Sequence, residues 1–171
     1  TIVLPESEDR RVLEATATIL KEGLANVVLI GNEEQIKKDA ADLDIAGAII
    51  PTLIDELPMI AAMAAVAEGE TRISDAGELK VKESNRIAVM AQNLTAMGAD
   101  VTETEDGMII RGGKPLRGAA IESHLDHRIA MTFAVASQCA EGVTEIRSGE
   151  CVSISYPCFY EDLMNLSGKR R

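Results

Sequence analysis

Aromatic side chains are scarce in this sequence: they make up 2% of its 171 residues, and tryptophan is absent. The core must therefore be built from Ala, Val, Ile, Leu and Met, and little aromatic surface is left on which nucleic-acid bases could stack. Positive charge is also in short supply, because 17 Lys and Arg residues stand against 28 Asp and Glu, a net charge of −11. This balance argues against nucleic acids and anionic membranes as partners, and an anionic substrate would need a local basic cluster.

Cysteines are few, and their spacing is not that of a metal site. Cys139, Cys151 and Cys158 form no CxxC pair, which predicts a reduced, cytoplasmic protein. The longest apolar run, 59–67, is too short to cross a membrane, and the chain opens on a strand-like segment with no sign of a signal peptide. Nothing in the pattern indicates a cofactor or a metal. Whether the chain forms a homodimer stays open.

The first 50 residues have the pattern of a βαβαβ unit. Continuous apolar strands are predicted at 2–4, 27–30 and 48–50, with helices that begin near Ser7 and Asn32 between them. Strands without polar alternation are typical of a parallel sheet covered on both faces. The expected fold class is α/β.

A different pattern begins near residue 51, with several helices and an antiparallel hairpin. The expected elements are helices at 59–67, 83–97, 127–140 and 159–166, strands at 71–74 and 144–146, and a hairpin formed by 101–104 and 108–111.

An internal repeat lies within this second part. The pattern Ala-Glu-Gly-x-Thr-x-Ile occurs at 67–73 and again at 140–146, and each copy follows an Ala-rich helix preceded by an aspartate, Asp55 or Asp126. Two copies of helix-then-strand favour a symmetrical assembly of sheets and helices, because a solenoid usually needs three or more repeats.

Basic residues stand at the starts of two predicted helices, where they oppose the helix dipole. Lys82 and Arg86 precede or open one helix, and His127 and Arg128 open another. A cation at a helix N-terminus costs roughly 0.3–1 kcal/mol, whereas an anion gains there. Each residue taken alone fits a solvated surface cation, but the two pairs together favour a phosphate or carboxylate bound between the two helix starts.

The second part resembles the C-terminal part of EPSP synthase (3-phosphoshikimate 1-carboxyvinyltransferase) over roughly residues 47–168. The resemblance rests on three motifs in the family's order and spacing, LIDELP at 53–58, KVKESNR at 80–86 and DHRIAM at 126–131, and on a Cys151…Tyr156-Pro157 ending. It implies two domains of repeated βαβαββ units. It also implies transfer of the enolpyruvyl group of phosphoenolpyruvate to shikimate 3-phosphate, a step of aromatic amino acid biosynthesis.

The resemblance also assigns roles to six residues. Asp55 would deprotonate the attacking hydroxyl, Lys82 would shuttle protons beside it, and Glu83 would transfer a proton at the methylene carbon of phosphoenolpyruvate. The implied substrate-binding residues, which would hold the phosphate and carboxylate, are Arg86, His127 and Arg128.

Two positions depart from the family pattern, and one domain has no counterpart. Asn85 stands where many members have Asp, and Ile154 stands where some have a further Lys for phosphoenolpyruvate. The family's other domain, which supplies much of the shikimate 3-phosphate site, has no match in the 171 residues. At most a partial phosphoenolpyruvate site is therefore expected, with no turnover by the chain alone.

The first 46 residues resemble a different family, phosphotransacetylase (phosphate acetyltransferase). The resemblance rests on IVLPESEDRRVLEA at 2–15 and VLIGN at 28–32. We therefore expect two segments, 1–46 and 47–171, in an engineered or recombined chimera. Three hypotheses stay open: a transferase remnant with part of a phosphoenolpyruvate site, a folded protein with no activity, and a phosphate acetyltransferase fragment.

Overall fold

The computed structural model describes residues 2–4, 27–29 and 43–167 of the chain. Strands β1 (Ile2–Leu4) and β2 (Val27–Leu29) pair in parallel. Both strands form where their apolar runs predict them. The helices predicted to begin near Ser7 and Asn32 fall outside the described residues.

The third predicted strand, at 48–50, is wrong. The strand forms earlier, as β3 (Leu43–Ile45), and 48–50 belongs to the short helices η1 (Gly47–Ile49) and α3 (Ile50–Leu53). Pro51 lies in the first turn of α3, where its missing N–H is harmless, whereas in a strand it would remove a hydrogen bond between strands. Gly47, with φ +68°, ends the extended backbone just before it.

A four-stranded sheet is the main scaffold of the described chain. Its strand order is β3-β4-β6-β5, where β4 is Glu70–Ile73, β5 is Asp100–Glu103 and β6 is Met108–Arg111. β3 pairs in parallel with β4, and β5 and β6 form the expected antiparallel hairpin. Because β3 precedes residue 47 and β4 follows it, one sheet crosses the predicted boundary between the two segments. The division at 46/47 stays a prediction.

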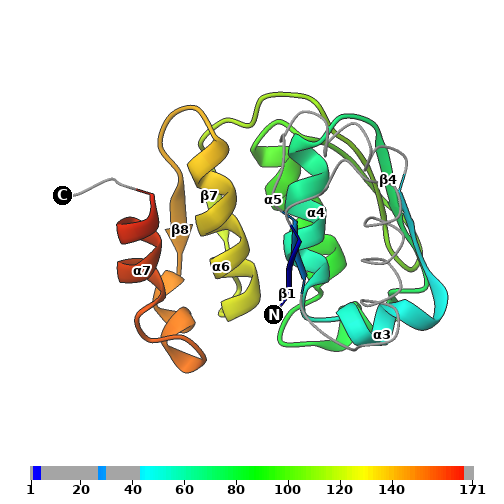
Figure 1. The fold of residues 1–171 in the computed structure, drawn as a ribbon, viewed down its shortest axis with the longest axis horizontal. Coiled ribbons are helices and arrows are strands. Elements are labelled where there is room, and N and C mark those ends of the chain that lie inside the picture. Colours follow the sequence, from blue (N-terminus) through cyan, green and yellow to red (C-terminus); the bar gives the residue numbers. More distant parts are fainter. Residues whose placement is uncertain (1, 5–26, 30–42, 168–171) are drawn as a thin grey trace.

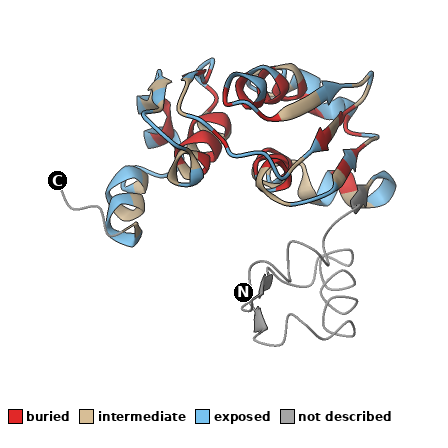
Figure 2. Cartoon of the chain, turned by 90° about the horizontal axis from the view of Figure 1, so that it is seen from above, coloured by how far each residue is buried: buried red, intermediate tan, exposed pale blue. Residues whose placement is uncertain are grey.

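Three helices pack together and carry most of the core. They are α4 (Leu57–Val66), α5 (Arg86–Ala96) and α6 (His127–Ala136), and each contacts the other two (Figure 1). α4 and α5 also pack on the four-stranded sheet, through contacts with β6 and β5. Figure 2 shows buried residues concentrated in these helices, as expected from their apolar spacing.

No single helix in the described part of the chain is long and apolar enough to cross a membrane. The pair Gly47–Leu53 and Leu57–Val66 reaches that length and composition only when joined, and it is bent by 105°.

The C-terminal part forms a smaller unit beside α6. β7 (Ala120–Glu122), which the sequence pattern did not predict, pairs in parallel with β8 (Glu145–Arg147). α7 (Phe159–Leu166) forms within its predicted bounds but buries none of its residues.

Three further 3-10 helices lie between these elements. η2 (Gly77–Val81) follows β4, η3 (Ser137–Cys139) follows α6, and η4 (Gly149–Ile154) follows β8.

The internal repeat has a structural counterpart. Each copy leads from an Ala-rich helix into a strand, α4 into β4 and α6, through η3, into β8. The repeat glycines Gly69 and Gly142 adopt φ of +105° and +97°, a region that other residues enter only with strain. The chain runs β3-α3-α4-β4-α5-β5-β6 and then β7-α6-β8-α7, apart from 3-10 helices.

Candidate anion-binding site

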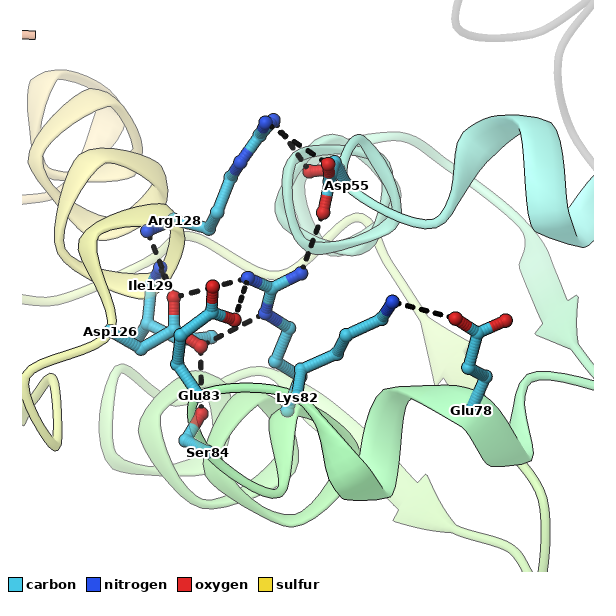
Figure 3. A network of polar contacts seen from close by, with 9 residues as sticks. Asp55, Glu78, Lys82, Glu83, Ser84, Asp126, Arg128 and Ile129 are labelled. Atoms are coloured by element: carbon cyan, nitrogen blue, oxygen red, sulfur yellow. Dashed lines mark hydrogen bonds and ion pairs between the residues drawn. The ribbon is translucent and has the colours of Figure 1, made fainter. Parts of the chain in front are cut away.

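The starts of α4, α5 and α6 converge on one buried arginine. Asp55 lies just before α4, Arg86 is the first residue of α5, and Asp126 is the residue immediately before α6. The Arg86 side chain is 1% exposed, and the Asp126 side chain is 0% exposed. The two aspartates that precede the repeated helices therefore meet at the same guanidinium (Figure 3).

Arg86 makes four hydrogen bonds to three carboxylates. Its Nε and Nη2 donate to Asp126 at 2.9 and 3.4 Å, its Nη1 donates to Asp55 at 3.0 Å, and its Nη2 donates to Glu83 at 2.7 Å. A buried charge is tolerated only when it is paired and hydrogen-bonded in this way. Arg86 therefore needs no external anion in the described state.

Asp126 organises the start of α6 as well as holding Arg86. Its Oδ1 accepts from the backbone N–H of Arg128 at 2.9 Å and of Ile129 at 3.4 Å, which caps the helix. The hydroxyl of Ser84 donates to its Oδ2 at 2.9 Å. One carboxylate thus ties the segment before α5 to the first turn of α6.

Asp55 bridges the two arginines. Its Oδ1 accepts from Arg86, its Oδ2 accepts from Arg128 Nη2 at 3.1 Å, and its backbone carbonyl accepts from Arg128 Nη1 at 3.3 Å. The Arg128 and Asp55 side chains are 34% and 43% exposed, so this end of the network is open to solvent. We refer to Asp55, Glu83, Arg86, Asp126 and Arg128 as the Arg86 cluster.

Two predicted site residues lie outside the cluster's hydrogen bonds. Lys82 Nζ donates to Glu78 at 2.6 Å, although its charge is near enough to act on Asp55 (Figure 3). His127, the first residue of α6, is half-buried and its side chain makes no hydrogen bond within the described residues. The structure thus brings Asp55, Glu83, Arg86 and Arg128 into direct contact. The catalytic and binding roles of all six residues stay predictions.

The two aspartates of the cluster have lowered pKa values. Burial disfavours the charged form of Asp126, but hydrogen bonds from Arg86 and Ser84 outweigh it and hold the pKa of Asp126 below its ordinary value. Burial also disfavours the charged form of Asp55, but the hydrogen bond from Arg86 and the charge of Arg128 outweigh it and lower the pKa of Asp55. Burial also disfavours the charged form of Arg86, but its hydrogen bonds to Asp126 and Asp55 outweigh this effect and raise the pKa of Arg86.

The lowered pKa of Asp126 predicts a specific loss of stability in acid. A carboxyl whose pKa is lower in the folded state stabilises the fold above its unfolded value of about 3.9, and this contribution disappears as pH falls through the folded value. We expect the difference in unfolding free energy between the native chain and Asp126→Asn to be constant from pH 7 to about 5 and to shrink below about 4. Urea unfolding at each pH measures it. A difference independent of pH down to acid unfolding would contradict the ion pair.

Asp126 and Ser84 were not among the predicted site residues. Two signals pointed to Asp126: its place before the His-Arg pair and its match with Asp55 in the repeat. No local signal connects Ser84 with a carboxylate that lies 42 positions away. Among the described residues, no group of three His, Cys, Asp or Glu side chains could hold a metal ion.

The fold and the cluster define an α/β protein in which two arginines and three carboxylates meet at converging helix starts. The chain belongs to the EPSP synthase family (3-phosphoshikimate 1-carboxyvinyltransferase), whose family model matches residues 4–163.

Individual relatives agree with this assignment. The 3-phosphoshikimate 1-carboxyvinyltransferase of Synechococcus sp. (strain JA-3-3Ab) is 57% identical over 122 residues, which cover 71% of this chain and 28% of the relative. That of Salinibacter ruber is 47% identical over 154 residues, 90% of this chain and 36% of the relative. The chain therefore spans about a third of the length of the curated relatives it matches.

Solved structures of EPSP synthase from Acinetobacter baumannii also match. One has a TM-score of 0.63 with 44% identity and covers 70% of this chain and 28% of its own. Another has a TM-score of 0.67 with 36% identity and covers 91% of this chain and 45% of its own. The family match runs across residue 46, and nothing in these comparisons supports a phosphotransacetylase portion or a chimera.

Proposed function

We propose that the chain carries part of the phosphoenolpyruvate site of an EPSP synthase, with Arg128 as its accessible cation. The observation that carries the proposal is the meeting of two arginines at the starts of α5 and α6, because N-terminal N–H groups and guanidinium donors both favour an anion. Arg86 is buried, whereas Arg128 is 34% exposed and can reach a ligand without unfolding the core. The reaction class, transfer of a carboxyvinyl group to 3-phosphoshikimate, is taken from the names of the relatives.

Within this proposal, each predicted residue keeps a role that its position allows. Asp55 is a carboxylate exposed on one side of the site, so it could hold the hydroxyl of shikimate 3-phosphate and accept its proton. Glu83 is half-exposed and could exchange a proton at the methylene carbon of phosphoenolpyruvate. Lys82, whose charge acts on Asp55 and whose Nζ pairs with Glu78, could move protons near that hydroxyl. His127 would line the ligand from the start of α6.

For the chain alone, we propose binding without turnover, and the proton-transfer roles would apply only with the rest of the site present. The chain spans about a third of the relatives' length, and much of the shikimate 3-phosphate site is expected from the other domain. We therefore propose that phosphoenolpyruvate binds and that the chain alone does not complete the transfer. The proposed site uses no cofactor. We also propose a cytoplasmic location, as the cysteine pattern predicts.

A second candidate is a folded protein without activity, and one observation favours it. Three carboxylates of the chain already accept from four of the five Arg86 N–H groups, so both arginines are explained as parts of an internal ion-pair network. The third hypothesis, a phosphate acetyltransferase fragment, finds no supporting observation in the described residues.

An amide NMR titration with phosphoenolpyruvate, with and without shikimate 3-phosphate, separates the first two candidates. We expect saturable shifts around Lys82, Arg86 and His127. In Arg128→Ala the affinity should fall about tenfold or more, because a hydrogen bond to a charged group contributes ~1.5–3 kcal/mol.

The control for this titration is Arg147→Ala. Arg147 carries the same charge, is 56% exposed and pairs with Glu122 in the β7–β8 unit. Arg147→Ala should leave the affinity for phosphoenolpyruvate within about twofold, because Arg147 lies outside the Arg86 cluster. Loss of its exposed ion pair should cost only ~0–1 kcal/mol of stability. A well-dispersed spectrum that does not change at millimolar phosphoenolpyruvate would reject the binding proposal and leave the inactive fold.

A further inference from the structure

We infer that Glu83 is a replaceable internal ligand of Arg86, which occupies the anion site until an anion displaces it. The inference rests on the proposed function and adds to it a mode of regulation: the chain competes with its own ligand. The juxtaposition that carries it is the Nη2 of Arg86, shared between the buried Asp126 and the half-exposed Glu83.

Charge balance favours a displacement. In the Arg86 cluster, two arginines face three carboxylates, a sum of −1, while Lys82 is paired with Glu78. A phosphate or carboxylate that joined this group unchanged would add negative charge to a group that is already negative. Close like charges repel strongly where water is partly excluded. Release of one carboxylate from Arg86 would therefore favour anion binding.

The three carboxylates differ in their freedom to leave. Asp126 is fully buried, caps α6 and accepts from Ser84, so its departure would break the helix start. Asp55 is held by both arginines and lies in the turn between α3 and α4. Glu83 makes one hydrogen bond to Arg86, and its side chain is 50% exposed. Glu83 can release Arg86 and remain on the exposed side of the site without leaving a buried charge unpaired.

The geometry after this exchange is well defined. When Glu83 leaves, Arg86 keeps its bonds to Asp126 and Asp55, and one Nη2 N–H is free. Two arginines then face two carboxylates, a neutral group that can accept an anion. An oxygen of the ligand would take the place of the Glu83 carboxylate, while Arg128 approaches from the exposed side.

The test uses the full chain with inorganic phosphate as the probe, and phosphoenolpyruvate in parallel. Removing the internal competitor should tighten binding, so we expect Glu83→Gln and Glu83→Ala to lower the Kd for phosphate by roughly fivefold, the worth of a partly exposed ion pair. The control is Glu105→Gln, which makes the same change in net charge at an exposed turn between β5 and β6. It should change the Kd less than twofold.

A second measurement follows the side chain itself. In the native chain, the carboxyl ¹³C signal of Glu83 should move to that of a solvated glutamate as phosphate saturates the site, with the same Kd. Unchanged or weaker phosphate binding in both Glu83 variants, or a Glu83 signal that does not move at saturation, would overturn the inference while leaving the anion site intact. Failure of the native chain and every variant to bind either anion would instead reject the proposed function.

Discussion

Asp126→Ala should lower the free energy of unfolding by about 3–5 kcal/mol, because it leaves a buried arginine without its main partner. Arg86 is 1% exposed, and two of its four hydrogen bonds go to Asp126. The same substitution removes the cap of α6, which by itself costs about 0.5–2 kcal/mol. Urea unfolding followed by circular dichroism measures the loss.

Two matched variants separate the parts of this effect. Asp126→Asn removes the charge and can keep the cap, so it should fall between the native chain and Asp126→Ala. Asp100→Ala removes a carboxylate that pairs with Arg111 and Lys114 at 38% exposure, and it should cost at most about 1 kcal/mol. If Asp126→Ala cost no more than Asp100→Ala, the buried network would not be a stabilising element of the fold.

Gly112→Ala should destabilise the chain by about 3 kcal/mol or more, the upper end of overpacking costs. A Cβ at this position would lie 1.9 Å from the carbonyl oxygen of Ala67 and 2.2 Å from that of Ala64. Both oxygens belong to backbone, which cannot rotate away as a side chain could. The Gly112 N–H also donates to Gly69 O at 3.0 Å, so a shift of this strand end would break the contact with the first repeat.

The control for Gly112→Ala is Gly77→Ala. A Cβ at Gly77 would meet no atom within 4 Å, so this substitution should change the unfolding free energy by less than about 1 kcal/mol. Both variants are compared by urea unfolding, and the yield of folded protein serves where Gly112→Ala does not fold. Equal stabilities would show that the end of β6 moves away from Ala67 at little cost.

The repeat explains why the candidate site lies where it does. An aspartate precedes each repeated helix, and packing of α4 against α6 brings both Asp55 and Asp126 to the Arg86 guanidinium. The repeat is recognisable in the sequence from its Ala-Glu-Gly segments. That the two aspartates share one arginine follows only from how the helices pack.

The positions of most elements were predictable because their signals are local. Apolar spacing located α4, α5 and α7, and a Glu-Asp-Gly turn placed the β5–β6 hairpin. The exceptions have local causes as well. The strand expected at 48–50 was displaced by Gly47 and Pro51, and β7 is only 3 residues long, too short for its alternation to stand out.

Candidate residues could also be read from local patterns, since cations at helix starts are unusual whatever the fold. Their partners could not, because the decisive contacts join positions 31, 40 and 73 apart along the chain. Burial is likewise a property of the packed helices: Arg86 looked like a surface ligand for an anion and is enclosed by carboxylates. Residue type and spacing therefore specified the helices and the candidate cations, whereas packing of three helix starts determined which charges neutralise one another.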